Sequence, residues 1–219
     1  FQIYGALVLV QFIFGLHYLT TSLIVDEVDA FEWTAIRILF AGILMYVFYH
    51  KRILNFPKGK DWNFLILLSI LGIILNTALF TKGLELTTPA HASLLSCMIP
   101  VMTLIFAWIL GYEEMNRYKS LSLIIAMSGA LILLGIDDLD ISSELFIGDI
   151  LVFINFTCFG LFLVLSKSMI KHHSPLGLSV LVMSIGAVLL LPLSAKGLYL
   201  NYDSWLSLPW WIYVAAFYS

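Results

Sequence analysis

The chain has 219 residues, of which 61% are hydrophobic and only 11% are charged, and its mean hydropathy is +1.00. A water-soluble globule of this length could not bury so much apolar surface, so the composition excludes the soluble globular classes. The formal net charge of -3 supplies no basic stripe for nucleic acid. We therefore predict a membrane protein, with the lipid bilayer and not nucleic acid as its partner.

Apolar runs with few or no charges follow one another along the whole chain. Most approach or exceed the ~18 to 20 residues that a helix needs to cross ~30 Å of hydrocarbon. Seven complete spans are predicted, and an eighth begins at residue 204; the seven lie at 1–25, 33–50, 62–81, 90–110, 120–136, 150–166 and 174–195. Because both chain ends fall inside apolar runs, we expect a fragment of a longer protein.

Two ionisable residues, His17 and Arg37, lie within the first two spans and need separate consideration. His17 lies about two-thirds along the first span, and an ionisable group inside a membrane is by default a functional candidate. The alternative is a neutral imidazole hydrogen-bonded to a neighbouring helix. Arg37 lies near the outer end of the second span, where its side chain can reach the headgroups or pair with Glu32 or Glu85. We expect structural roles for Arg37 and Glu85.

Four spans carry small, polar or aromatic residues at steps of three and four, which places them on one helix face. These residues are Gln11, Gly15, Tyr18 and Ser22 in the first span, Ser69, Gly72, Asn76 and Phe80 in the third, Ser93, Ser96, Cys97, Pro100 and Thr103 in the fourth, and Asn155, Phe159, Phe162 and Ser166 in the sixth. Such faces either pack helices together, at ~0.6 kcal/mol per hydrogen bond, or line a cavity. The packing interpretation suits Asn76 and Asn155 less well, because an amide has several groups to satisfy.

The fourth and fifth spans contain features of helix geometry. Thr88 is predicted to cap the fourth span, with Pro89 in the first helical position and His91 near the membrane interface. Pro100 removes one helical hydrogen bond and so weakens the middle of the same span. In the fifth span, Gly129 and the small residues beside it predict close helix packing, either within the chain or in a homodimer.

The basic residues between the spans divide unevenly between the two sides of the membrane. One set of connections holds eight of them and the other holds only Lys82 and Lys196; the eight are Lys51, Arg52, Lys58, Lys60, Arg117, Lys119, Lys167 and Lys171. Cytoplasmic loops carry the excess of basic residues in membrane proteins. We therefore predict a multi-pass protein of the cell membrane whose N-terminus lies in the cytoplasm.

Weak internal similarity suggests a repeat that starts again after five spans. "FIFGLHYLTTSL" is similar to "CFGLFLVLSKSM", with Gly15 aligned to Gly160, and "LFAGILM" is similar to "MSIGAVLLL", with Gly42 aligned to Gly186. An odd number of spans reverses the starting side of the membrane, so the second copy would be inverted.

The sequence also resembles a known family. "FGLHYLTTSL", "AFEWTAIRILFAG" and above all the block from Gly83 to Ile136, with its mid-span proline and "GYEE" loop, resemble the EamA-type branch of the drug/metabolite transporter superfamily. The similarity covers the first five spans well and the next two more loosely. Family members usually have Trp where Phe14 stands and often Asn where His17 stands, so no relative's substrate can be transferred.

The resemblance implies an all-α polytopic membrane protein with ten spans in two inverted five-span repeats. Residues 1–136 would form the first repeat and residues 148–219 an incomplete second one, with about three spans missing. A central cavity lined by spans one, three, four and six would hold the substrate. The candidate substrate-binding residues are then His17, Tyr18, Asn76, Ser93, Ser96, Asn155 and Phe162.

These observations favour a secondary transporter that moves a small metabolite, such as an amino acid or a drug-like solute, by alternating access. We expect export, with His17 as a candidate for proton coupling. The chain has no HExxH, G-x-S-x-G or Walker A motif, so we expect no enzyme, no metal and no cofactor. The alternative is a membrane scaffold or a membrane-embedded enzyme.

The charge distribution makes a testable prediction about topology. Lys58→Cys and Asp138→Cys, each made in a protein lacking Cys97 and Cys158, should differ in their reaction with an impermeant thiol reagent on intact cells. Position 138 should be labelled and position 58 should not, because the acidic loops face outward. Labelling at position 58 alone would reverse the orientation.

Overall fold

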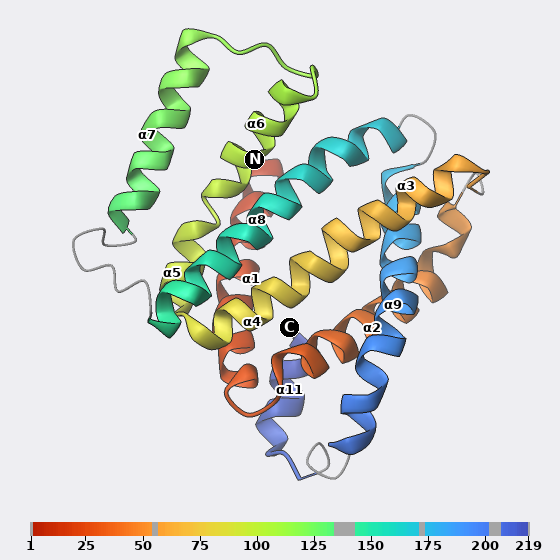
Figure 1. Cartoon of the computed structure of the whole chain (residues 1–219). Helices are drawn as coiled ribbons and strands as arrows, with labels where there is room; N and C mark the ends of the chain where they lie inside the picture. The colour runs from red at the N-terminus through yellow and green to blue at the C-terminus, as the bar shows by residue number, and fades with distance from the viewer. Residues whose placement is uncertain (1, 54–56, 134–142, 171–173, 202–206, 219) are drawn as a thin grey trace.

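The protein is described by a computed structural model that covers residues 2–53, 57–133, 143–170, 174–201 and 207–218. Every regular element in these ranges is helical (Figure 1). In chain order the elements are α1 (Gln2–Val25), α2 (Ala30–Tyr49), η1 (His50–Arg52), α3 (Lys60–Ser69), η2 (Ile70–Leu75), α4 (Asn76–Leu86), α5 (Pro89–Leu95), α6 (Met98–Ile109), α7 (Arg117–Leu133), α8 (Glu144–Met169), α9 (Pro175–Leu200) and α11 (Trp210–Tyr218).

Six helical stretches within the described ranges are long and apolar enough to cross a membrane, and they match the first four, the sixth and the seventh predicted spans. The fifth span corresponds to α7, of which 17 residues are described, and α11 lies in the eighth. Many large apolar side chains point outward, as a surface embedded in lipid requires. The prediction of an all-α polytopic membrane protein is confirmed. Asp138, used above to test the topology, lies outside the described residues.

The third and fourth spans are both interrupted. The third passes from α3 through the π-helical segment η2 into α4, and such segments occur frequently at functional sites. The fourth is divided into α5 and α6 by a turn at Ser96 and Cys97. Pro100, in the first turn of α6, has no N–H to donate to the Ser96 carbonyl, which accepts from the Ile99 N–H at 3.0 Å instead. The helix break therefore lies one turn before the proline.

Local sequence also determines where the fourth span begins and ends. Thr88 caps α5 by accepting a hydrogen bond from the His91 N–H at 3.2 Å, with Pro89 in the first helical position, so this prediction is confirmed. At the other end, Gly111 has a φ of +74°, a conformation that favours glycine. This turn lets the Tyr112 N–H reach the Ala107 carbonyl at 2.8 Å, which closes α6 and explains the "GYEE" loop.

Helices α4, α6 and α8 approach one another closely because glycines lie at the contacts. In Figure 1, α4 (yellow) and α8 (teal) run side by side. A Cβ atom on Gly83 would lie 2.7 Å from Cγ2 of Val152, and one on Gly148 would lie 2.7 Å from the backbone nitrogen of Thr87. Gly160 meets α6 in the same way. Backbones at this separation leave no room for a side chain.

A second close contact joins α2 to α9, and η2 packs beside it. A Cβ atom on Gly42 would lie 2.9 Å from the Cβ of Ala187, and one on Gly186 would lie 2.8 Å from Cγ2 of Ile73. The two glycines aligned in the predicted repeat thus serve different contacts, one between α2 and α9 and one between α9 and η2. Spans two, three and seven consequently meet.

Three contacts between spans bear on the inverted repeat, which stays a prediction. Span three (α3, η2 and α4) packs on span six (α8), span one (α1) on span eight (α11), and span two (α2) on span seven (α9). In a five-span repeat, a symmetry axis relates spans one, two and three to spans six, seven and eight. This axis converts the contact between spans three and six into the contact between spans eight and one. It converts the contact between spans two and seven into itself. The repeat boundaries at 1–136 and 148–219 stay a prediction.

The glycine contacts predict that the same substitution lowers stability at one site and not at another. Gly83→Ala should lower the unfolding temperature of the purified protein in detergent, by an amount equivalent to about 1–3 kcal/mol, because α4 and α8 must move apart. Gly129→Ala in α7 is the control, because its new Cβ would meet nothing within 4 Å. The close approach of α4 and α8 would be wrong if Gly129→Ala destabilised the protein and Gly83→Ala did not.

Candidate functional site

A cavity of about 330 Å³ lies between α1, α2, η2, α4 and α9. This volume is at the lower end of the roughly 300–1,000 Å³ that is usual for small-molecule sites. Most of its wall is apolar, and the polar side chains are a histidine, an arginine and a threonine. The lining residues are Ile13, Phe14 and His17 of α1, Arg37, Ile38 and Ala41 of α2, Ile73 of η2, Thr77 of α4 and Met183 of α9.

His17 and Arg37 are in contact with each other in the lining of the cavity. The Arg37 Nη1 atom lies 3.2 Å from the His17 Nε2 atom, and the His17 Nδ1 atom lies 3.3 Å from the Thr21 hydroxyl oxygen. A guanidinium can only donate, so Nε2 must accept and the ring proton must be on Nδ1. The Nδ1–H group then donates to Thr21. This pair of contacts therefore fits a neutral imidazole in one tautomer.

Among the described residues, the positive charge of Arg37 is not paired with a carboxylate. Glu85, one of the partners expected from the sequence, instead accepts from Lys82 at 2.7 Å, and Glu32 accepts from the side-chain amide of Asn201. In the described part of the chain, no carboxylate lies within ion-pair distance of the Arg37 guanidinium. Arg37 lies seven residues after Ala30, the start of α2, or ~10 Å along the helix, so it reaches well into the span.

An aromatic cluster continues from His17 toward the fourth span. Phe80 of α4 stacks on the His17 ring at 5.9 Å between centroids and meets Tyr18 edge-on at 5.3 Å. The Tyr18 side chain lies near Ser96 at the break between α5 and α6. Three of the predicted binding residues, His17, Tyr18 and Ser96, are thus brought together, but only His17 lines the cavity itself.

Asn76 and Asn155 contact each other and do not line this cavity. The Asn155 side-chain amide donates to both the side-chain oxygen and the backbone oxygen of Asn76, and the Asn76 amide donates to the Gly72 carbonyl at 3.2 Å. Asn155 is fully buried. These contacts hold α4 against α8, which is the packing role that the sequence left open.

The other predicted binding residues lie apart from the cavity lining. Phe162 of α8 covers Gly72 and stacks on Phe159, so it packs between α8 and η2. Ser93 is exposed, and its hydroxyl donates to the Ala90 carbonyl of its own helix at 2.8 Å. The sequence did not single out Thr77, which lies next to Asn76 and turns toward the cavity. Helical periodicity groups residues into faces, but it cannot show which face of a helix meets which neighbouring helix.

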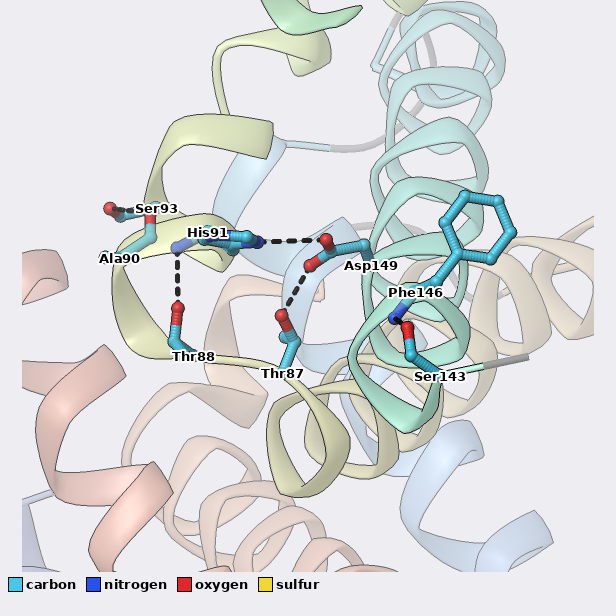
Figure 2. Close-up of polar contacts among 8 residues, drawn as sticks. All are labelled: Thr87, Thr88, Ala90, His91, Ser93, Ser143, Phe146 and Asp149. Atoms are coloured by element: carbon cyan, nitrogen blue, oxygen red, sulfur yellow. Dashed lines mark hydrogen bonds and ion pairs between the residues drawn. The ribbon is translucent and has the colours of Figure 1, made fainter. Parts of the chain in front are cut away.

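A second polar cluster ties the connection between α4 and α5 to the start of α8, and Figure 2 shows Asp149 between its partners. The buried Asp149 carboxylate accepts hydrogen bonds from the Thr87 hydroxyl and from His91 Nδ1, the latter at 2.9 Å. Thr88 caps the helix that carries His91. No group of three or more potential metal-ligating side chains gathers within the described ranges. The hydrogen bonds of Asp149 join the start of α8 to the connection between α4 and α5.

Comparison with known proteins places the chain among transporters. Residues 2–135 match the model of the EamA-like transporter family. The uncharacterized transporter YyaM of Bacillus subtilis is 32% identical over 59% of this chain and 43% of its own length. An uncharacterized transporter of Archaeoglobus fulgidus is 25% identical over 80% of this chain and 61% of its own length. The WAT1-related protein At5g47470 of Arabidopsis thaliana is 29% identical over 59% of this chain and 38% of its own length.

The chain spans about half the length of the curated relatives that it matches. No solved structure matches it significantly. The family match covers well over half of the 219 residues, and it agrees with the membrane-spanning helices described above. The chain therefore belongs to the EamA-like transporter family, within the drug/metabolite transporter superfamily.

Proposed function

We propose that the chain is part of a secondary transporter that moves a small metabolite across the cell membrane by alternating access. The observation that carries this proposal is the position of the His17–Arg37 cavity, where α1, α2, η2 and α4 meet α9. In the predicted repeat arrangement, α9 belongs to the second repeat and the other elements to the first. The cavity would then lie between the repeats, where transporters of this construction bind their substrates.

Two irregular helices beside the substrate path supply places where the spans can bend. The π-helical segment η2 contributes Ile73 to the cavity wall. The break at Ser96 and Cys97 lies next to Tyr18, which contacts the aromatic cluster around His17. Backbone of this kind inside a membrane is tolerated where it is buried in protein or lines a cavity. Rocking of the repeats would change the helix geometry at these two places.

We propose a cytoplasmic N-terminus and transport out of the cell. The excess of basic residues in one set of loops supports the orientation. Export is proposed because a titratable His17 within the first span would suit a proton-coupled exporter. Gly129 on α7 has open space beside it, which supports the use of this face in a homodimer. The described helices then form one protomer, with α7 at its edge (Figure 1).

His17 is the proposed site of proton coupling. Arg37 of α2 is the charged group that faces it, while Phe80 of α4 stacks on it and Tyr18 is its aromatic neighbour on α1. A protonated imidazole could not accept the Arg37 hydrogen bond. Proton binding at His17 and the observed position of Arg37 are thus mutually exclusive, which links the proton to the geometry of the cavity.

A membrane scaffold or a membrane-embedded enzyme is the alternative function. The hydrogen bonds between Asn76 and Asn155 favour a packing role for those two residues, as a scaffold would need. They do not account for an arginine and a histidine in a cavity of about 330 Å³. Transport assays on the full-length protein separate the two functions.

A cavity-filling substitution tests the transport proposal. Ala41→Trp should abolish flux of any solute that the full-length protein carries in proteoliposomes, because the indole would occupy the cavity. Ile43→Trp on the same helix is the matched control, because Ile43 is 60% exposed and lies outside the cavity lining. Both variants are first checked for wild-type unfolding temperature. Equal flux in the two variants would place the substrate path elsewhere.

A second test concerns proton coupling. His17→Asn keeps a polar side chain beside Arg37 but removes the titratable ring. The wild-type transport rate should change with pH over the range in which both proteins stay folded, and the variant rate should stay nearly constant, because an asparagine side chain does not titrate. Initial rates in proteoliposomes with equal pH on both sides provide the measurement. An unchanged pH profile would show that His17 carries no coupling proton.

A further inference from the structure

Within the described ranges, the positive charge of Arg37 inside the membrane-spanning helices has no opposite charge beside it. Its guanidinium stays protonated under all ordinary conditions, and its neighbours in the cavity wall include Ile38, Ala41 and Ile73. Its hydrogen-bond partner among the described residues is the neutral His17 ring. A cation in apolar surroundings is unfavourable unless an opposite charge lies beside it. The described part of the chain places no such charge there.

The unused donors of Arg37 face the cavity and are not sealed within protein. A guanidinium has five N–H groups, and the contact with His17 uses one of them. The buried side-chain atoms without a partner belong to Trp33, Asn155 and Ser184, so the Arg37 nitrogens are not among them. Arg37 is also only partly covered and lines the cavity. Its remaining donors can therefore pair with a molecule in that space.

We propose that this cavity binds a small organic monocarboxylate, whose carboxylate pairs with two N–H groups of Arg37. The fork of the guanidinium matches the two oxygens of a carboxylate, and such pairs are among the stronger hydrogen bonds in proteins. One binding anion neutralises the one cation of the cavity. This inference rests on the proposed transport function and specifies its substrate class.

The other residues of the cavity lining indicate which class of anion the cavity binds. The walls formed by Ile13, Phe14 and Ile38 offer apolar surface for a hydrocarbon or aromatic group attached to the carboxylate. A phosphate ester with two negative charges would need a second cation, and Arg37 is the one charged residue among the described residues of the lining. A zwitterionic amino acid would need an anionic partner for its ammonium group, and the described part of the lining contains no carboxylate.

His17 is the positioning residue for this site. Its Nε2 atom accepts a hydrogen bond from one N–H of Arg37. Its Nδ1–H group donates to the Thr21 hydroxyl, which favours the tautomer that leaves Nε2 free to accept. The stacked Phe80 ring prevents the imidazole from turning away. The guanidinium is thereby oriented before the anion arrives, which lowers the entropy cost of binding.

Benzoate and its neutral isostere benzamide provide a direct test with the full-length wild-type protein in detergent. Saturable binding, measured by calorimetry and by the shift in unfolding temperature, is expected for benzoate and should be weaker by roughly tenfold or more for benzamide. Phenyl phosphate and phenylalanine should also bind more weakly than benzoate. Equal binding of benzoate and benzamide, or tighter binding of phenylalanine or phenyl phosphate, would overturn the proposal without any variant.

Variants then assign the effect to Arg37. Arg37→Met should lose the preference for benzoate, and Arg37→Lys should retain part of it, because an ammonium keeps the charge but not the fork. Lys82→Met is the control: Lys82 is exposed, paired with Glu85 and outside the cavity lining, so the preference should persist. A preference for benzoate that survives in Arg37→Met, or that is lost in Lys82→Met, would contradict the assignment.

The same variants distinguish this proposal from the transport proposal. Benzoate binding that depends on Arg37, without flux of any tested solute into proteoliposomes, would leave the anion site standing and contradict the transport function. Solute flux that is blocked by Ala41→Trp, without benzoate binding that depends on Arg37, would leave the transport function standing and contradict the anion site. Each proposal can therefore fail separately.

Discussion

The hydrocarbon interior of a membrane offers no water to polar groups, and the rest of this structure depends on that constraint. The backbone satisfies it by forming helices throughout the described ranges. Buried polar side chains satisfy it in pairs across helices: Asn155 donates to Asn76, and Thr34 contacts Thr81. Each pair removes polar groups from the apolar interior and at the same time fixes which two helices are neighbours.

At the His17–Arg37 cavity a charge lacks a partner of opposite sign among the described residues. Arg37 has a neutral partner in His17 but no counter-charge among the described residues, whereas Asp149 is paired with His91 and Thr87. Asp149 belongs to a closed cluster that joins helix ends, and Arg37 belongs to an open space of about 330 Å³. A carrier needs both kinds of contact: fixed contacts hold the helices in place, and an unsatisfied group gives the substrate something to bind.

The helix bundle contains close helix–helix contacts, which glycines permit, and irregular segments, where the helices are interrupted. The α4–α8 and α2–α9 contacts are close because Gly83, Gly148 and Gly42 have no side chains. By contrast, η2 and the turn between α5 and α6 interrupt the regular hydrogen bonding of spans three and four. Both irregular segments lie beside His17 or its aromatic neighbours, so the deformable parts of the backbone are close to the candidate site.

Hydropathy, charge and local geometry were enough to predict the class of fold, the order of the spans and the helix start at Thr88, because each depends on residues that are close in sequence. The candidate site was only partly predictable. Periodicity placed Asn155 on a polar face, and its ionisable ring singled out His17, but neither signal could show that Asn155 meets Asn76, 79 positions away. It also assigned Arg37 to headgroups or acidic partners, whereas the folded chain places it against His17. Sequence determined which residues need a polar partner, and the tertiary structure decided which partner each one has, because that choice depends on how distant helices pack.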